Sequence, residues 1–125
     1  MANNIYETVV TQINPTEPKE VYSLNIYAFK NAKFLVSVVD ETNEKISSFE
    51  TFVSYKNQPS LAALSTTGSP IGDTILYTFS VELILAVQPT ENDRIVLKVL
   101  NSEAVPLKVY VGEMERVEWN RSNNF

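Results

Sequence analysis

Apolar and polar residues alternate with a period of two along most of the chain, and β-branched or aromatic residues fill many of the apolar positions. Because successive side chains of a strand point to opposite faces, this alternation predicts half-buried β-strands. Clusters of Pro, Gly, Asn and Asp separate the alternating segments, as in turns. The predicted strands span residues 5–13, 21–29, 33–39, 46–55, 74–87, 94–100, 105–111 and 113–119.

The clearest hairpin joins residues 33–39 to residues 46–55 through the polar cluster at residues 40–44. Such a cluster of turn-forming residues between two alternating segments is typical of an antiparallel pair. Its alternation predicts that one face carries Phe34, Val36 and Val38 from the first strand, and Phe49, Thr51, Val53 and Tyr55 from the second.

Two later segments are harder to divide into strands. Residues 74–87 predict either one long bent strand or two strands that meet near Glu82. Residues 94–100 and 105–111 predict another antiparallel pair across the turn at residues 101–103. Because Pro106 has no backbone donor, it favours an edge position for the second of these strands.

Residues 57–73 have a different composition, in which Pro, Gly, Ser and Thr dominate. We expect a long surface loop there, with or without one short helical turn at residues 61–64. A loop of this length in a small domain is often functional. Leu61, Leu64 and Ile71 are apolar residues in this otherwise polar segment, so they are candidate interface residues.

The whole pattern predicts an all-β protein, a β-sandwich or jelly-roll-like fold of about eight or nine short antiparallel strands. No amphipathic helix, internal repeat or interdomain linker is evident, and 125 residues suit one domain. We therefore expect a single domain over residues 1–125. Residues 1–19 are a candidate N-terminal arm, and residues 120–125 are a frayed tail.

The first strand and the C-terminal tryptophan are further candidates for subunit contacts. Proline-containing turns follow residues 5–13, so this strand either pairs across subunits as an added strand or pairs within its own sheet. Trp119 either packs the C-terminus onto the body or lies in a subunit interface, where Trp is enriched. The candidate interface residues of these segments are Ile5, Tyr6, Val9, Val10 and Trp119.

The chain contains no histidine and no cysteine. This composition excludes Ser-His-Asp and Cys-His catalytic groups, zinc sites built from Cys or His, and disulfides. We therefore expect no enzyme activity, no cofactor and no metal. A calcium site shared between loops and a carboxylate-only lyase or hydrolase are the weaker alternatives.

Carboxylates are the candidates for acid–base chemistry in such a chain. Two groups of them lie in predicted turns, where Asp and Glu serve local structure: Asp40, Glu41 and Glu44 in one, Glu91 and Asp93 in the other. Alternation places Glu50 and Glu82 on strand faces that point away from the core. The tyrosines favour core packing, with carbohydrate binding as the alternative use of their rings.

The net charge is −5, and the ten basic residues are scattered along the chain. Nucleic-acid binding and a polybasic membrane tether both need clustered Lys and Arg, so we expect neither partner. The N-terminal residues MANNIYETVV lack the basic and apolar regions of a signal peptide. We therefore expect synthesis in the cytoplasm without secretion by a signal peptide.

Residues 33–100 resemble small β-sandwich domains of virion proteins from tailed bacteriophages. The resemblance lies in AKFLVSVVDETNEKISSFETFVSYKNQ, in the Gly/Ser/Thr-rich segment that follows it, and in YTFSV at residues 77–81. It continues through LAVQPTEND at residues 85–93 into IVLKV at residues 95–99. The chain departs from that pattern in the turn at residues 56–59 and in the further strand pair after Leu100.

This resemblance implies a non-enzymatic structural protein located in the virion and made in the cytoplasm of a host bacterium. It would be a capsid decoration protein or a component of the tail or a fibre. Its implied partners are other copies of itself, with a trimer as the expected form, and virion proteins such as the major capsid or tail protein. A carbohydrate-binding β-sandwich module is the alternative.

Overall fold

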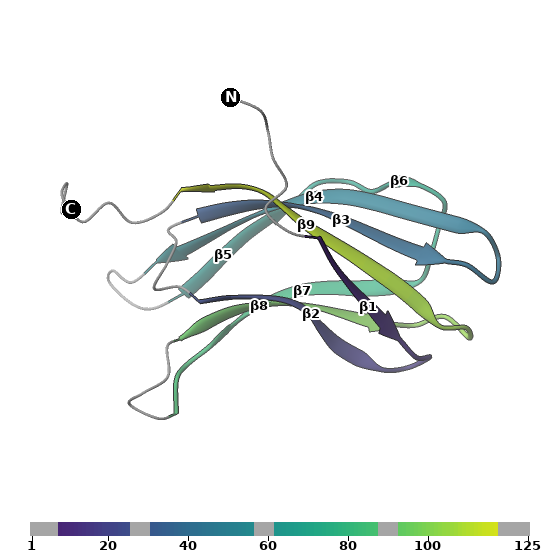
Figure 1. The fold of residues 1–125 in the computed structure, drawn as a ribbon, viewed down its shortest axis with the longest axis horizontal. Helices are drawn as coiled ribbons and strands as arrows, with labels where there is room; N and C mark the ends of the chain where they lie inside the picture. The colour runs from purple at the N-terminus through teal and green to yellow at the C-terminus, as the bar shows by residue number, and fades with distance from the viewer. Residues whose placement is uncertain (1–7, 26–30, 57–61, 88–92, 118–125) are drawn as a thin grey trace.

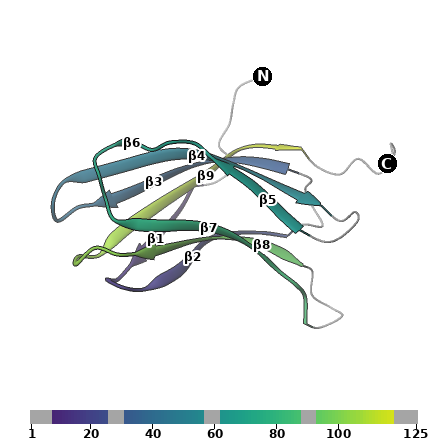
Figure 2. The same cartoon turned by 180° about the vertical axis from the view of Figure 1, so that it is seen from behind.

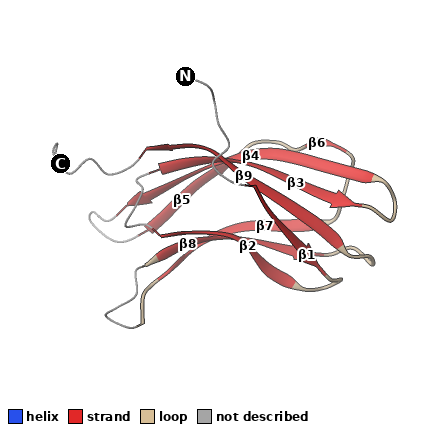
Figure 3. Ribbon diagram, in the orientation of Figure 1, coloured by secondary structure: helices blue, strands red, loops and turns tan. Residues whose placement is uncertain are grey.

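The computed structural model describes residues 8–25, 31–56, 62–87 and 93–117, and every regular element in these ranges is a strand (Figure 3). In this part of the chain no helix is long and apolar enough to cross a membrane. The strands are β1 (Thr8–Ile13), β2 (Pro18–Asn25), β3 (Asn31–Asp40), β4 (Lys45–Lys56), β5 (Ala62–Thr67), β6 (Ile71–Gly72), β7 (Tyr77–Ile84), β8 (Arg94–Asn101) and β9 (Leu107–Val117).

These strands form two antiparallel sheets that pack face to face (Figure 1). The large sheet has the order β1-β9-β3-β4-β5, with β6 paired to β4, and the small sheet has the order β2-β8-β7. The predicted all-β sandwich is therefore confirmed. Figure 1 views the side with β1 and β2 in front, and Figure 2 views the opposite side, with β5 and β7 in front.

The predicted hairpin is confirmed as β3 and β4, which pair continuously from Asn31–Ser54 to Asp40–Lys45. Its turn is stabilised by the buried Asp40 carboxylate, which accepts hydrogen bonds from the backbone nitrogen of Asn43 at 3.0 Å and from its side-chain amide at 2.8 Å. Glu44 closes the turn with a φ of 55°. Asp40 therefore has the structural role in the turn that the sequence predicts.

The Asp40 turn makes the stability of the hairpin dependent on pH. The Asn43 side-chain hydrogen bond is the main cause that lowers the pKa of Asp40 below its ordinary 3.8. A lowered folded-state pKa stabilises the fold above pH 3.8, and this stabilisation is lost as the pH falls through the lower value. We expect Asp40→Asn to reduce the loss of stability on acidification, as measured by urea unfolding above and below pH 3.8. An unchanged dependence on pH would contradict this role.

The structure corrects the predicted pairing of the last strands. Residues 94–100 and 105–111 do not form a hairpin, because β8 pairs with β2 and β7 while β9 pairs with β1 and β3. The edge position predicted from Pro106 is also wrong, since β9 lies inside the large sheet. Pro106 directly precedes the first paired residue, Leu107, so its missing N–H removes no bond from the ladder.

Three other boundaries also differ from the prediction. The expected loop at residues 57–73 contains β5 and β6, both paired with β4. Of the two alternatives for residues 74–87, a single strand is present: β7, which contains Glu82 and is shorter than predicted. The strand expected at residues 113–119 is the continuation of β9, which passes a β-bulge opposite Lys33 and Phe34.

The core lies between the inner faces of the two sheets. It includes Phe34, Val36 and Val38 of β3, Val109 and Val111 of β9, and Ile95, Leu97 and Val99 of β8, all fully buried. Burying such a side chain contributes about 1.5–3 kcal/mol each, so these strands dominate the stability of the sandwich. Aromatic rings join the sheets, with Phe49 of β4 in edge contact with Phe79 of β7 at 5.0 Å between centroids.

One acidic side chain is also fully buried between the sheets. Glu113 of β9 continues the inward alternation of Leu107, Val109 and Val111, and the hydroxyl of Tyr22 on β2 donates a hydrogen bond to its Oε1 at 3.1 Å. A second bulge, between Glu20 and Tyr22, lies on β2 itself. Strict alternation from the sequence does not anticipate either bulge.

Candidate protein–protein interface

The outer face of the large sheet is the face that points away from the small sheet. Cross-strand register places on it the side chains that alternate with the core residues of β1, β9, β3, β4 and β5. A sheet face in contact with water normally carries mostly polar residues. This face carries polar residues such as Lys33, Ser48 and Glu50. Among them lie the apolar residues Val10, Tyr110, Leu35, Val39, Ile46, Phe52 and Leu64.

Four of these apolar side chains are strongly exposed: Val10 at 52%, Ile46 at 47%, Phe52 at 54% and Leu64 at 51%. They come from the two edge strands β1 and β5 and from β4, with polar residues such as Ser37, Ser48 and Glu50 between them. Single exposed apolar residues are ordinary, but an apolar surface shared by several strands is typical of a protein–protein contact.

The polar side chains between these apolar residues are paired with one another. Lys33 forms an ion pair with Glu50 at 3.6 Å, and its Nζ lies 5.5 Å from the centroid of the Phe52 ring. The hydroxyls of Ser37 and Ser48 share a hydrogen bond at 2.8 Å. Because these groups already have partners, covering the face leaves few polar atoms unsatisfied.

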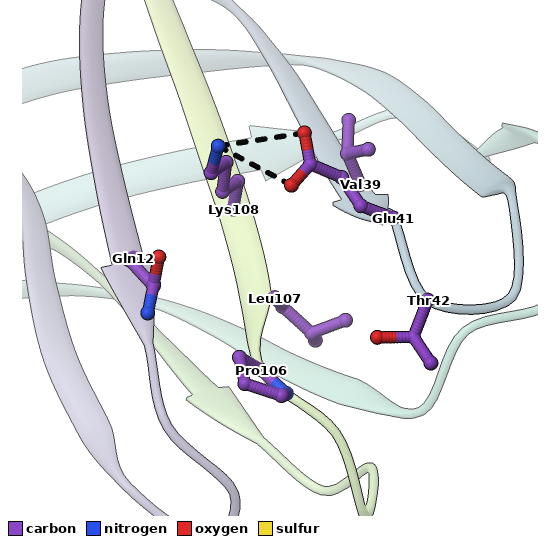
Figure 4. A pocket seen from close by; sticks show the side chains of 7 residues that line it. All are labelled: Gln12, Val39, Glu41, Thr42, Pro106, Leu107 and Lys108. Carbon is purple, nitrogen blue, oxygen red and sulfur yellow. Dashed lines mark hydrogen bonds and ion pairs between the residues drawn. The ribbon is translucent and has the colours of Figure 1, made fainter.

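A shallow pocket of about 170 Å³ indents one end of this face, where β1, β9 and β3 come together (Figure 4). The amine of Lys108 lies 3.2 Å from Oε1 of Glu41 across the pocket wall. The remaining lining residues are Gln12, Val39, Thr42, Pro106 and Leu107. The wall therefore combines a neutralised ion pair with apolar surface, which suits contact with a protein side chain or backbone.

The small sheet presents a different outer face. Arg94 pairs there with Glu20 at 3.4 Å, and Lys98 pairs with Glu82 at 3.3 Å. Thr78 and Ser80 are exposed beside them, Val96 is buried among its neighbours, and the apolar Leu100 is 37% exposed. Most exposed side chains of this face are polar, as is typical of a solvated sheet surface. The two outer faces thus differ in chemistry, and the large sheet provides the candidate interface.

The structure brings together only part of the interface set predicted from the sequence. Val10 and Leu64 lie on the outer face of the large sheet, and Ile71 is 74% exposed in β6, opposite Ser48. Val9 points inward and is half-buried. The other predicted residues lie outside the described part of the chain: Ile5, Tyr6, Leu61 and Trp119.

The first strand pairs within its own chain where the structure describes it. Residues 8–13 pair with β9, from Thr8–Gly112 to Ile13–Leu107. Of the two arrangements open from the sequence, this is pairing within the sheet of the same chain.

Sequence reasoning missed Phe52 and Ile46. Both lie on β4, whose alternate positions Phe49, Thr51 and Val53 supply the core. A strand with apolar residues on both faces was the available signal, because a strand that is solvated on one side needs them on one face only.

The carboxylates and tyrosines considered from the sequence for catalysis, metal binding or sugar binding lie in ordinary structural positions where the chain is described. Glu50 and Glu82 point away from the core, as predicted. Asp93 accepts a hydrogen bond from the backbone nitrogen of Ala86 at 2.7 Å, which is a turn contact. Tyr22, Tyr55 and Tyr77 pack against the core, as predicted, whereas Tyr110 lies on the outer face of the large sheet. Within the described ranges, no three Asp or Glu side chains lie close enough together to hold a metal ion.

No protein-family model matches this sequence, and no curated protein sequence matches it. Among solved structures, the tailspike protein of Acinetobacter phage vB_ApiP_P1 aligns with 94% of this chain at a TM-score of 0.44 and 13% identity. The chain spans 21% of the length of that tailspike chain. At this TM-score and identity the likeness establishes neither a shared fold nor a shared function.

Proposed function

We propose that this chain is a non-enzymatic structural protein of a tailed-bacteriophage virion, either a capsid decoration protein or a component of the tail or a fibre. It associates with itself and docks onto neighbouring virion proteins, and it is made in the cytoplasm of the host bacterium. The observation that carries the docking function is the apolar outer face of the large sheet, in which exposed Val10, Ile46, Phe52 and Leu64 surround paired polar groups.

The physical argument runs from this surface to assembly. A face with exposed apolar side chains gains free energy when a partner covers it, in proportion to the apolar area removed from water. Covering the face leaves none of Lys33, Glu50 and the two serines unpaired, since they keep the partners they already have. The assignment to a phage virion is supported by the resemblance of residues 33–100 to virion β-sandwich domains. Carbohydrate binding stays an untested prediction that no contact of the described residues favours.

The docking face is tested by exchanging one of its exposed side chains. We expect Phe52→Thr to reduce incorporation of the chain into phage particles by about tenfold, because an aromatic anchor at an interface is commonly worth more than about 1.4 kcal/mol. Thr keeps the strand preference of this position, so the fold is retained. The measurement is the ratio of this chain to the major capsid protein in purified particles of a phage that encodes it, by quantitative mass spectrometry.

The matched control is Leu100→Thr, which changes an exposed apolar residue on the outer face of the small sheet. This variant is expected to enter particles at the level of the unaltered chain. Absence of the unaltered chain from purified particles would overturn the virion assignment. An equal loss for both variants would overturn the assignment of docking to the large sheet.

A further inference from the structure

Along one side of the sandwich, β5 of the large sheet and β7 of the small sheet lie next to each other (Figure 2). The small sheet has fewer strands than the large one, and its edge strand β7 leaves four inward-facing side chains only half-buried: Tyr77, Phe79, Val81 and Leu83. Their cross-strand neighbours Ile95, Leu97 and Val99 on β8 are fully buried. On the large sheet, Tyr55 and Ala63 are half-buried on the same side.

The other edge strand of the small sheet is β2, which lies beside β1. Its Val21 and Leu24 are 2% and 3% exposed, its Tyr22 is half-buried, and the two strands line a pocket of about 280 Å³. The same strand carries Pro18, Lys19 and a bulge. Proline, charge and bulges are the devices by which edge strands avoid pairing with another chain. β2 is therefore protected as an edge.

The β5/β7 side has none of these devices in its described strands. Neither β5 nor β7 contains proline, and their pairings with β4 and β8 are regular. Glu82 is the charged residue of these two strands, and its ion pair with Lys98 neutralises it. An edge that is regular, uncharged and flanked by half-buried apolar side chains is suited to strand addition.

We infer that a second copy of this chain occupies this side, with β7 of each copy paired antiparallel across a two-fold axis perpendicular to the small sheet. The result is a continuous sheet in the order β2-β8-β7-β7-β8-β2. This inference rests on the self-association in the proposed function and names its surface. It gives a two-fold pair rather than the trimer predicted above.

A second copy fits this side better than a single extended peptide, for two reasons. The first is the pattern of β7 itself, in which apolar Tyr77, Phe79, Val81 and Leu83 alternate with Thr78, Ser80, Glu82 and Ile84. Such a strand supplies the apolar face that is needed to cover its own copy, and antiparallel pairing keeps both apolar faces on the core side.

The second reason is that a second copy brings the β5 edges together as well as the β7 edges. A two-fold axis perpendicular to the small sheet leaves both large sheets on the same side of the joined sheet. Because β5 lies beside β7 in each copy, the two β5 edges then face each other as well. An isolated peptide strand would cover one edge only. The outer face of the large sheet stays free in this pair to dock onto other proteins.

The experiment combines the solution mass with single-cysteine crosslinking. Because the sequence contains no cysteine, each introduced thiol is unique. Thr78→Cys and Ser80→Cys place a thiol at exposed positions of β7, and Ser23→Cys places one at an exposed position of β2 as the matched control. Each full-length variant is studied by light scattering over a concentration series and by reaction with a short bismaleimide crosslinker. Circular dichroism checks that the fold is retained.

We expect the mass of a dimer, with crosslinking through the β7 thiols at least about tenfold more efficient than through the control, because paired strands lie about 4.8 Å apart. A dimer or trimer that crosslinks equally well or better through Ser23→Cys would overturn the β7 assignment while leaving self-association in place. A monomer at all concentrations would overturn the inference together with self-association. In that case the incorporation of the Phe52→Thr variant into particles still tests docking of the large sheet independently.

Discussion

Replacing Asn101 with alanine is expected to lower the free energy of unfolding by about 3–5 kcal/mol, because several buried hydrogen bonds at about 1–3 kcal/mol each are lost together. Asn101 ends β8 and is fully buried. Its side-chain amide donates to the carbonyl of Ile13 at 3.0 Å and to the carbonyl of Val105 at 2.9 Å. Its Oδ1 accepts from the backbone nitrogen of Glu103 at 2.7 Å.

The backbone of Asn101 adds to this network. Its carbonyl accepts from the nitrogen of Thr16 at 2.9 Å, and its own nitrogen donates to the carbonyl of Glu17 at 3.1 Å. Thr16 holds a φ of 63°, which a β-branched residue rarely adopts. Asn101 thus ties the turn between β1 and β2 to the turn between β8 and β9. Its loss is expected to loosen both turns, where the chain passes between the two sheets.

The measurement is urea unfolding followed by circular dichroism. Asn101→Asp is the more specific test of this network. It keeps the acceptor for Glu103 but places an oxygen against the carbonyls of Ile13 and Val105. The control is Asn14→Ala, an exposed asparagine in a neighbouring turn, with an expected change within about 0.5 kcal/mol. If the control and Asn101→Ala lower the free energy of unfolding by similar amounts, the buried hydrogen bonds of Asn101 do not stabilise the fold as assigned.

Replacing Gly72 with alanine is expected to cost about 2–4 kcal/mol, because the new side chain meets both backbone strain and an overlap. Gly72 has a φ of 104°, where residues other than glycine are strained. A Cβ at this position would overlap the backbone carbonyl oxygen of Ile46. That carbonyl also accepts the hydrogen bond from the nitrogen of Asp73 at 2.7 Å, which holds β6 against β4. The substitution is therefore expected to displace β6.

Gly68 provides the matched control in the same segment. A Cβ there would approach the carbonyl oxygen of Glu50 at 3.6 Å, an ordinary contact. We expect Gly68→Ala to change the stability by less than about 1 kcal/mol. Urea unfolding gives the two free energies, and hydrogen exchange at the amides of Asp73 and Ile46 reports on β6 directly. If exchange at these amides is as slow in Gly72→Ala as in the unaltered chain, the assigned overlap is wrong.

Local pattern was sufficient for much of the fold. The alternate positions of Phe34, Val36 and Val38, together with the turn after Asp40, predicted the β3–β4 hairpin and its buried face. Such signals succeed because period-2 alternation and turn chemistry act between residues that are near in sequence.

The candidate interface was predicted less completely. Leu64 and Val10 were identified from the sequence, but Phe52 and Ile46 were not, although alternation places them on the face opposite Phe49, Thr51 and Val53.

The sequence by itself determined that this protein is built from antiparallel strands around an apolar core, and that it lacks the side chains for His- or Cys-based chemistry. The tertiary structure decided which strands share a sheet. β8 and β9 follow one another in the chain, yet Asn101 anchors a crossing between the sheets instead of a hairpin turn. The β-bulges in β2 and β9, and the half-buried inner side chains of β7, likewise depend on the partner strands present. Alternation assigns faces to one strand at a time, whereas neighbours in a sheet are chosen by packing between residues far apart in sequence.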